Sequence, residues 1–290
     1  MSIVEMDDVT HIAHQQALIV ILREFNRVCT TLHIPYVLFA GTLLGAVRHQ
    51  GFIPWDDDVD VMMLREDYER FLREADQVLD QSKFFLQKEF SEHWPMFFSK
   101  LRLNHTTCLE KYHPKDKETH QGVYMDIFPC DAAFRSHWGR KLQFLTSKIV
   151  IAKSLDKRGY DTDSKKKRLL MMCCKLLPMK PFLSVTKGGS KDSGYVHSFL
   201  GGASSFQKNV YPRDYFEQRT EALFEGSKYP IPLKYHDLLR TLYGDYMCMP
   251  SPEQRVYKQH AILVDLDRSY EDYQNYRDGM IFEVHTRSIR

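Results

Sequence analysis

Four carboxylates within five residues, at positions 56–60, constrain this chain more than any other feature of its sequence. The alternation of Asp58, Val59 and Asp60 predicts a strand over 58–64, with both carboxylates on one face and the valines on the other. Two like charges on one face repel, so this arrangement needs a compensating cation. Oxygen-rich sites of this kind suit Mg²⁺ or Mn²⁺, which hold phosphates while charge develops on them. The segment therefore points to phosphoryl-transfer chemistry.

Hydrophobic periodicity predicts how the chain around this segment is organised. Pro35 is expected to end a long helix that runs from Thr10 to about His33, and Gly41 and Thr42 are expected to turn the chain. Two further helices are predicted over 43–48 and 66–79. Strands are predicted over 36–39, 84–86, 97–103 and 123–128. Beyond about Trp138 the pattern is mostly helical with loops.

A third acidic residue lies in a later predicted strand, inside the run Tyr124-Met-Asp-Ile-Phe128. On a strand, Asp126 points to the opposite face from Met125 and Ile127. A lone carboxylate between apolar neighbours is costly unless it is paired or bound to a metal. Asp126 is therefore a candidate partner for the acidic run at 56–60.

Length and composition exclude several classes of protein. With 290 residues, the chain is long enough for one large domain or two small ones. Its six cysteines form no C-x-x-C pair, which favours a reducing compartment over a disulfide framework. The acidic start at 1–8 does not resemble a secretory signal, and no apolar stretch is long enough to span a membrane. We therefore expect a cytoplasmic protein.

The net charge of +2 hides a strong asymmetry along the chain. Between Arg135 and Lys187 there are fourteen Lys or Arg and only three acidic residues, so this segment carries +11 and the remainder −9. Its basic residues alternate with apolar clusters such as 149–151 and 169–174. Such a region indicates either peripheral contact with an anionic membrane surface or a solvated basic face on helices that pack on the core. No nucleic-acid motif is present.

The run Gly41-Thr-Leu-Leu-Gly-Ala-Val-Arg-His49, continued by Gly51-Phe-Ile-Pro-Trp-Asp-Asp-Asp-Val-Asp60, resembles the signature of the LicD family of the nucleotidyltransferase-fold superfamily. Fukutin-related proteins are relatives of this family. Further resemblance lies at 100–102, at 124–129 and at 242–247 with Pro250. The resemblance implies an α+β fold, a nucleotidyltransferase-type mixed β-sheet flanked by helices with a mostly helical C-terminal half. It also implies a catalytic core at 1–135 and a region at 136–290 that completes the acceptor site.

The reaction implied by the resemblance is metal-dependent transfer of phosphocholine, or a similar phospho-alcohol, from a CDP-alcohol such as CDP-choline. The acceptor would be a hydroxyl of a cell-surface glycan, such as teichoic acid or lipopolysaccharide, or its lipid-linked precursor, and CMP would leave. Asp58, Asp60 and Asp126 would hold Mg²⁺ or Mn²⁺, and Asp126 could instead act as a general base. The residues expected to bind donor or nucleotide are Gly41, Thr42, Gly45, Arg48, His49, Trp55, Lys100 and Arg102.

Alternatives remain open at this point. Arg48 and His49 fit a phosphate contact or an ordinary surface helix end, and Lys100 and Arg102 fit an anionic partner or exposed strand charges. A choline cation is usually held over aromatic rings. The aromatic candidates are Trp55, Tyr112, Tyr124, Tyr243 and Tyr246, with Trp55 favoured because it adjoins the acidic run. A nucleotidyltransferase that releases pyrophosphate and a non-catalytic nucleotide-binding protein are the competing functions.

Overall fold

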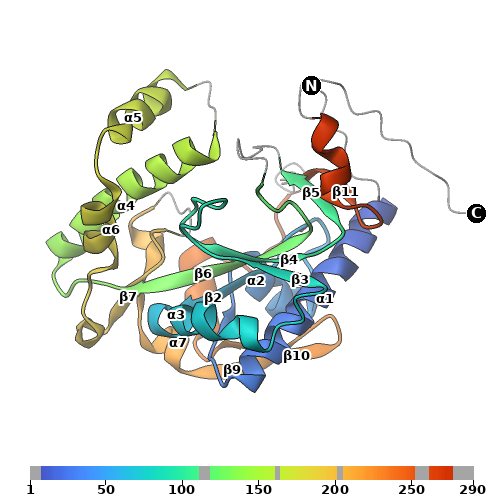
Figure 1. Cartoon of the computed structure of the whole chain (residues 1–290). Helices are drawn as coiled ribbons and strands as arrows, with labels where there is room; N and C mark the ends of the chain where they lie inside the picture. The colour runs from blue at the N-terminus through green and yellow to red at the C-terminus, as the bar shows by residue number, and fades with distance from the viewer. Residues whose placement is uncertain (1–7, 111–117, 161–163, 201–204, 252–260, 277–290) are drawn as a thin grey trace, which may run out of the picture.

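The computed structural model describes residues 8–110, 118–160, 164–200, 205–251 and 261–276 of the chain. Its centre is a seven-stranded mixed sheet in which β1, β2, β6, β4 and β3 lie side by side, and β7 and β8 extend it beyond β6 (Figure 1). Only β2 and β6 pair in parallel among these strands; the other pairs are antiparallel. Two further pairs, β9 with β10 and β5 with β11, lie outside it.

The elements have the following bounds. The strands are β1 (Val37–Leu38), β2 (Asp60–Leu64), β3 (Phe84–Gln87), β4 (Ser99–Leu103), β5 (Thr107–Glu110), β6 (Tyr124–Ala132), β7 (Tyr195–His197), β8 (Val210–Pro212), β9 (Arg219–Phe224), β10 (Ser227–Pro232) and β11 (Ala261–Asp265). The α-helices are α1 (Asp8–Thr31), α2 (Ala40–His49), α3 (Arg65–Glu74), α4 (His137–Arg158), α5 (Lys165–Lys175), α6 (Met179–Lys187), α7 (Asp214–Glu217) and α8 (Tyr235–Tyr243). Short 3₁₀ turns lie at 75–77, 191–193, 207–209 and 270–276.

Helices α1 and α3 cover one face of the sheet. The apolar stripe of α1, which includes Leu18, Leu22 and Phe25, is fully buried against this face. Met125 and Ile127 of β6 point toward the same core, as the alternation along the strand predicts. Each such side chain contributes roughly 1.5–3 kcal/mol by leaving water. The opposite face of β6 is left to Asp126 and its neighbours.

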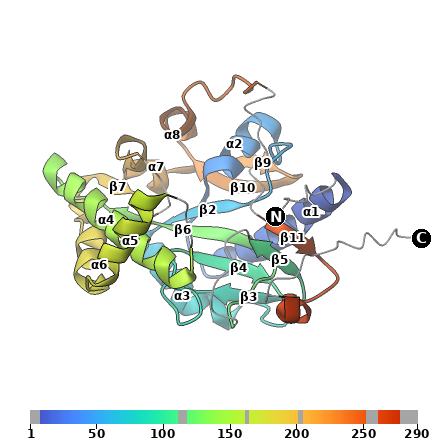
Figure 2. The same cartoon turned by 90° about the horizontal axis from the view of Figure 1, so that it is seen from above.

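Helices α4, α5 and α6 lie together at one side of the molecule in both views (Figures 1 and 2). Helix α4 packs on α6 and α5. A second apolar cluster, which includes Trp94, Phe98 and Val150, joins these helices to the sheet through Phe128. We call α4, α5 and α6 the helical lobe.

The structure confirms the expected α+β class and the mixed sheet flanked by helices. Two boundaries differ from the sequence-based prediction. Helix α2 starts at Ala40 rather than at Leu43, and β2 starts at Asp60, so Asp58 lies in the preceding loop instead of on the strand. The C-terminal half is helical in the lobe but also contributes β7 to β11. Strand alternation alone could not show where pairing with β1 and β6 begins.

Candidate active site

A row of polar side chains crosses the central sheet. In the register of the strands, Asp60 of β2 pairs with Asp126 of β6, and Asp126 pairs with Lys100 of β4. Lys100 in turn pairs with Gln87 of β3. Paired residues on neighbouring strands point to the same face of a sheet. The register therefore brings Asp60 and Asp126 together, as the sequence analysis predicted, and adds a buried ammonium beside them.

Burial disfavours the ionised forms of Asp60 and Asp126. Burial, and then the carboxylates of Asp58 and Asp126, raise the pKa of Asp60 well above its usual range. Burial also raises the pKa of Asp126, against the opposing effect of Lys100, whose Nζ lies 3.2 Å from its Oδ1. That buried oxygen accepts no hydrogen bond of good geometry within the described chain. Both acids would be stabilised by a further cation.

These residues fit a hard divalent cation in their chemistry. The candidate ligands are all carboxylate oxygens, which Mg²⁺ and Mn²⁺ prefer, and the buried Oδ1 of Asp126 has the ammonium of Lys100 nearby but accepts no hydrogen bond of good geometry within the described residues. Asp60 and Asp126 are neighbours, while Asp58 lies just outside the strand. Among the residues that the structure describes, no three His, Cys, Asp or Glu side chains form a ready-made metal site. A centre with all three aspartates remains a prediction.

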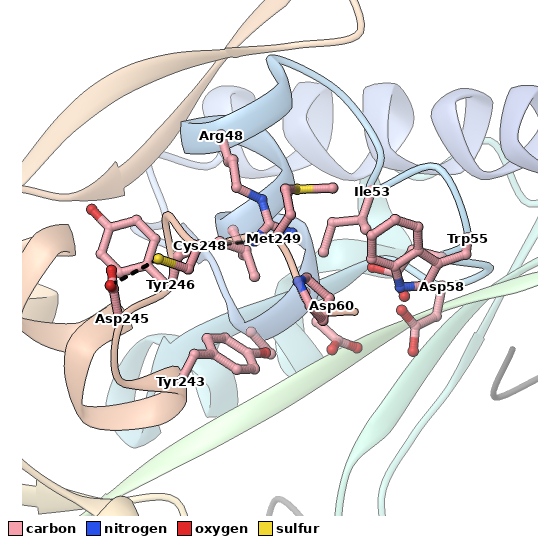
Figure 3. Close-up of a pocket in the computed structure, with 15 residues that line it drawn as sticks. Arg48, Ile53, Trp55, Asp58, Asp60, Tyr243, Asp245, Tyr246, Cys248 and Met249 are labelled. Atoms are coloured by element: carbon pink, nitrogen blue, oxygen red, sulfur yellow. Dashed lines mark hydrogen bonds between the residues drawn. The ribbon is translucent and has the colours of Figure 1, made fainter. Parts of the chain in front are cut away.

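A cavity of about 650 Å³ opens at Asp60 (Figure 3). It lies between two parts of the chain: the stretch from α2 to the start of β2, and the segment that follows α8. Figure 3 shows Asp58 beside Trp55 and the ring of Tyr243 directed toward Asp60. The lining residues are Ala40, Gly41, Leu44, Arg48, Ile53, Trp55, Asp56, Asp58, Asp60, Tyr243, Asp245, Tyr246, Cys248, Met249 and Pro250.

The N-terminus of α2 forms one wall of this cavity. Ala40 begins the helix in a left-handed conformation, with φ of 47°, which is unusual for a residue with a side chain. Ala40 and Gly41 line the cavity, so the first turn of α2, whose dipole favours anions, lies at its wall. A Cβ on Gly41 would lie 2.6 Å from Oδ2 of Asp56. A side chain at position 41 would therefore displace the carboxylate of Asp56 from its place against the helix.

Thr42 has a structural role that its sequence position did not reveal. It lies within the first turn of α2 and is buried, and its Oγ1 accepts a hydrogen bond of 2.8 Å from the backbone N–H of Asp60. The hydroxyl thus ties α2 to the first residue of β2. The contact of Thr42 with a donor diphosphate stays a prediction, because its hydroxyl is hydrogen-bonded to the backbone of Asp60 here.

Gly45 allows the loop after α2 to return closely over the helix. A Cβ at this position would lie 2.4 Å from the backbone carbonyl oxygen of Gly51. No real side chain is accommodated at such a distance without a backbone shift. Gly45 therefore allows the close approach of Gly51 to α2, and it does not line the cavity itself.

Arg48 joins the two walls of the cavity. Its Nη1 donates a hydrogen bond of 2.7 Å to the carbonyl of Tyr246, and its Nε donates to Nε2 of His49 at 2.9 Å. Burial, and then the guanidinium of Arg48, lower the pKa of His49. Arg48 lines the cavity, whereas His49 does not line it and accepts the hydrogen bond from Nε of Arg48. The cation predicted for phosphate contact is therefore present at the site.

Lys100 and Arg102 share one strand face, as predicted, but both are buried. Nζ of Lys100 lies 3.1 Å from the centre of the Tyr124 ring, and Arg102 donates to Gln87 and to the carbonyl of Gly122. Glu110 balances these charges, because Arg158 and Lys100 pair with its carboxylate at 2.5 and 3.4 Å. The two cations support the acidic row from within the protein. A direct contact with donor remains a prediction.

The aromatic candidates separate into two groups. Trp55, Tyr243 and Tyr246 line the cavity, whereas Tyr124 is buried beside Lys100, and Tyr112 lies outside the described residues. Partial burial, and then the carboxylates of Asp60 and Asp56, raise the pKa of Tyr243. Aromatic faces therefore meet carboxylates at this opening, a combination suited to an organic cation.

Three side chains of α1 position the acidic loop, and sequence reasoning missed them. Nε2 of His14 bonds to the carbonyl of Asp57 at 3.0 Å, and Nε2 of Gln15 donates to that of Asp56 at 3.0 Å. Nε2 of His11 bonds to the carbonyl of Pro54 at 3.2 Å. The signal was present in the sequence as polar residues at positions 11, 14 and 15, spaced to share one helix face. Only the fold reveals what lies opposite that face.

The acidic residues of this site lie in a segment that matches a known protein family. Residues 33–154, which contain α2, the acidic loop, β2 and Asp126, match the model of the family described as "LicD/FKTN/FKRP, nucleotidyltransferase domain". The part of the chain that carries the acidic row is therefore similar to the nucleotidyltransferase domain of the LicD family. The LicD-type segment ends within α4. The wall formed by 243–250 therefore comes from outside the matched segment and completes the cavity of the LicD-type domain.

Curated relatives extend the similarity over most of the chain. The lipopolysaccharide cholinephosphotransferase LicD of Haemophilus influenzae is 28% identical over 274 residues, covering 83% of this chain and 92% of that protein. An uncharacterized protein of Rickettsia typhi is 43% identical over 63 residues, or 22% of this chain and 19% of its own length. The match to the first protein is longer than the segment 33–154.

Proposed function

We propose that this protein transfers phosphocholine, or a similar phospho-alcohol, from a CDP-alcohol to a hydroxyl of a cell-surface glycan or its lipid-linked precursor, with release of CMP. The observation that carries this proposal is the register of Asp60 with Asp126 at a cavity walled by the N-terminus of α2. Similarity to a lipopolysaccharide cholinephosphotransferase over most of the chain supports the choice of headgroup and acceptor class.

The donor's diphosphate would lie between the first turn of α2 and Arg48. Backbone N–H groups at a helix N-terminus and a guanidinium both favour phosphate oxygens. Asp60 and Asp126, with Asp58 as the third candidate ligand, would hold Mg²⁺ or Mn²⁺ there. When bound, this ion neutralises phosphate oxygens and stabilises charge on the leaving CMP.

The choline headgroup would occupy the aromatic side of the cavity. Trp55 and Asp58 lie on one side of Asp60 and Tyr243 on the other (Figure 3), so ring faces and carboxylates line the space in which a quaternary ammonium would lie. An uncharged headgroup such as glycerol would gain less from these contacts. The cavity therefore favours a cationic phospho-alcohol.

As the alternative to its metal-binding role, Asp126 would orient the acceptor hydroxyl and take its proton. Burial raises its pKa toward the range useful to a general base, while Lys100 holds its carboxylate in position. The acceptor oxygen then attacks phosphorus in line with the departing phosphate of CMP. No covalent intermediate with the protein is needed.

The test is to incubate the full chain with Mg²⁺, glycan acceptor and a panel of CDP-alcohols, and to measure CMP and pyrophosphate by chromatography. We expect CMP to form fastest with CDP-choline and Asp58→Asn to abolish it. Asp192→Asn, an exposed acid remote from Asp60, is the matched control. Pyrophosphate release would instead support a nucleotidyltransferase. Nucleotide binding without a metal-dependent product would support a binding protein, and undiminished CMP release by Asp58→Asn would refute the metal role.

A further inference from the structure

The apolar stripe of α5 faces away from the protein. Leu169, Met172, Cys173 and Leu176 follow the i, i+3, i+4, i+7 spacing of a helix face, and all four are exposed. Leu169, Met172 and Leu176 are 56%, 62% and 90% exposed, respectively. Cys174, on the opposite side of the helix, is buried. An amphipathic helix of a globular domain normally turns its apolar stripe inward, whereas among the residues that the structure describes nothing covers this stripe.

The first half of α4 also turns large apolar side chains outward. Trp138, Leu142 and Leu145 are spaced at i, i+4 and i+7, and they are 76%, 49% and 62% exposed. Gln143 and Thr146, which directly follow Leu142 and Leu145 in the chain, are buried instead. Two helices of the lobe therefore present large apolar side chains to the outside.

Positive charge surrounds these apolar side chains. Helices α4, α5 and α6 contain thirteen Lys or Arg and a single acidic residue, Asp156. On α5, Lys165, Lys167 and Lys175 are exposed beside the apolar stripe. Lys141 lies with its Nζ 4.6 Å from the centre of the Trp138 ring. Apolar residues flanked by Lys and Arg favour a surface that combines acyl chains with negative charge.

The geometry favours a helix that lies on a membrane over one that crosses it. In the described part of the chain, no single helix has the length and apolar character of a membrane span, although the bent pair 167–175 and 179–187, at 107°, passes that test together. Helix α6 is held on the protein, because Oγ1 of Thr186 and Oγ1 of Thr146 lie 2.9 Å apart and Phe182 packs on the second apolar cluster. Insertion of the pair would break these contacts.

We propose that the helical lobe binds an anionic lipid bilayer, with the stripe of α5 in the interfacial layer. A second copy of this chain is a poorer occupant, because face-to-face pairing would bring two strongly basic surfaces together. The proposal goes beyond the proposed reaction and does not depend on it. Because β6 carries Asp126 and leads directly into α4, binding would hold the acidic site near the membrane surface.

The experiment is cosedimentation of the full chain with vesicles of phosphatidylcholine, alone or mixed with phosphatidylglycerol. We expect binding only to the mixed vesicles. Leu169→Glu with Leu176→Glu should lower the partition coefficient by more than tenfold, because two apolar contacts are lost and negative charge is added. Lys165→Glu with Lys167→Glu should lower it by about tenfold or more.

Leu233→Glu is the matched control, because Leu233 is 51% exposed but lies next to β10, away from the lobe. Circular dichroism checks that each variant is folded. The proposal is overturned if wild-type protein stays in the supernatant with the mixed vesicles, or if Leu169→Glu with Leu176→Glu binds as well as the control. It is also overturned if neither the wild type nor any variant binds vesicles and light scattering shows a wild-type oligomer that this double variant dissociates. Neither cosedimentation nor light scattering measures transfer of phosphocholine. Failure of the membrane proposal can therefore be told apart from failure of the proposed function.

Discussion

The ammonium of Lys100 lies 3.2 Å from Oδ1 of Asp126, and the two residues stand opposite each other on β4 and β6. Lys100 is almost completely buried, between this carboxylate, Glu110 and the ring of Tyr124. A buried lysine is unfavourable without partners, so its presence here indicates that the acidic row needs an internal cation. The ammonium of Lys100 thus favours the ionised form of Asp126, against the burial that raises the pKa of this carboxyl.

Replacing Lys100 with methionine should therefore change the pH dependence of transfer. Without the ammonium, the pKa of Asp126 rises further, and the acid limb of the rate profile should move to higher pH by about 1–3 units. Initial rates of CMP release between acid and neutral pH measure this. Lys88→Met, which removes a more exposed lysine paired with Asp76, is the control. An unchanged profile in folded Lys100→Met would rule out this role.

Asp60→Asn should make the protein more stable and less active at the same time. The raised pKa of Asp60 means that its ionised form is opposed by burial and by neighbouring carboxylates. Neutralising it at pH 7 should raise the free energy of unfolding by about 1–3 kcal/mol. Transfer should fall at least about a hundredfold if Asp60 holds the cation.

Urea denaturation and CMP release test the two effects of Asp60→Asn separately. Asp192→Asn should change neither quantity. A less stable Asp60→Asn variant that keeps its activity would contradict both expectations.

Two glycines of α2 should respond differently to alanine. In Gly41→Ala the new methyl meets the carboxylate of Asp56, which is the end of a movable side chain. We expect a folded protein with impaired donor binding. In Gly45→Ala the methyl meets the backbone carbonyl of Gly51, so we expect a loss of about 1–3 kcal/mol in stability.

Thermal unfolding and the KM for CDP-choline distinguish these outcomes, and each glycine variant serves as the other's control. If Gly41→Ala proves the less stable of the two while binding donor normally, the assigned roles are reversed.

Trp55→Ala should weaken the preference for a cationic headgroup. Loss of one ring face from a quaternary ammonium costs about 1–2 kcal/mol, or roughly a five- to thirtyfold fall in kcat/KM for CDP-choline. The fall should be smaller for CDP-glycerol, which carries no cation in its headgroup. Trp138→Ala, at an exposed tryptophan of the lobe, is the control with soluble substrates. Equal losses for both donors would place the choline elsewhere.

His197 should make stability sensitive to acid. Burial of the fully enclosed ring lowers its pKa to about 4, although the nearby carboxylate of Asp131 and the 3.0 Å hydrogen bond of Nε2 to the carbonyl of Thr186 oppose this shift. Above pH 6.5, the ordinary value, histidine is neutral in both the folded and the unfolded chain. As pH falls below that value, the unfolded chain gains the proton first, so stability is lost toward pH 4.

From pH 7 to pH 5 this loss should be about 2 kcal/mol. Denaturation by urea at the two pH values should show a correspondingly smaller loss in His197→Gln than in the wild type. His137→Gln, at an exposed histidine, should leave the loss unchanged. Identical pH dependence in wild type and His197→Gln would show that another group is responsible.

Local pattern alone determined a large part of this protein. The alternation around Asp60 and around Asp126 placed both acids on strand faces, and the amphipathic spacing of 10–33 and 66–79 predicted α1 and α3 to within a few residues. Such predictions succeed because side-chain direction repeats with a period of two in strands and 3.6 in helices. The basic character of 135–187 was likewise plain in the sequence.

Only the tertiary structure decided which of these residues meet. The parallel pairing of β2 with β6 sets Asp60 beside Asp126, whereas Asp58 lies two residues before the start of β2. Packing also enclosed Lys100 and Arg102, turned Thr42 toward the backbone of Asp60, and brought Tyr243 across from α8 to the same cavity. Register, burial and the approach of distant segments depend on contacts between residues far apart in the chain, and local periodicity carries no information about them.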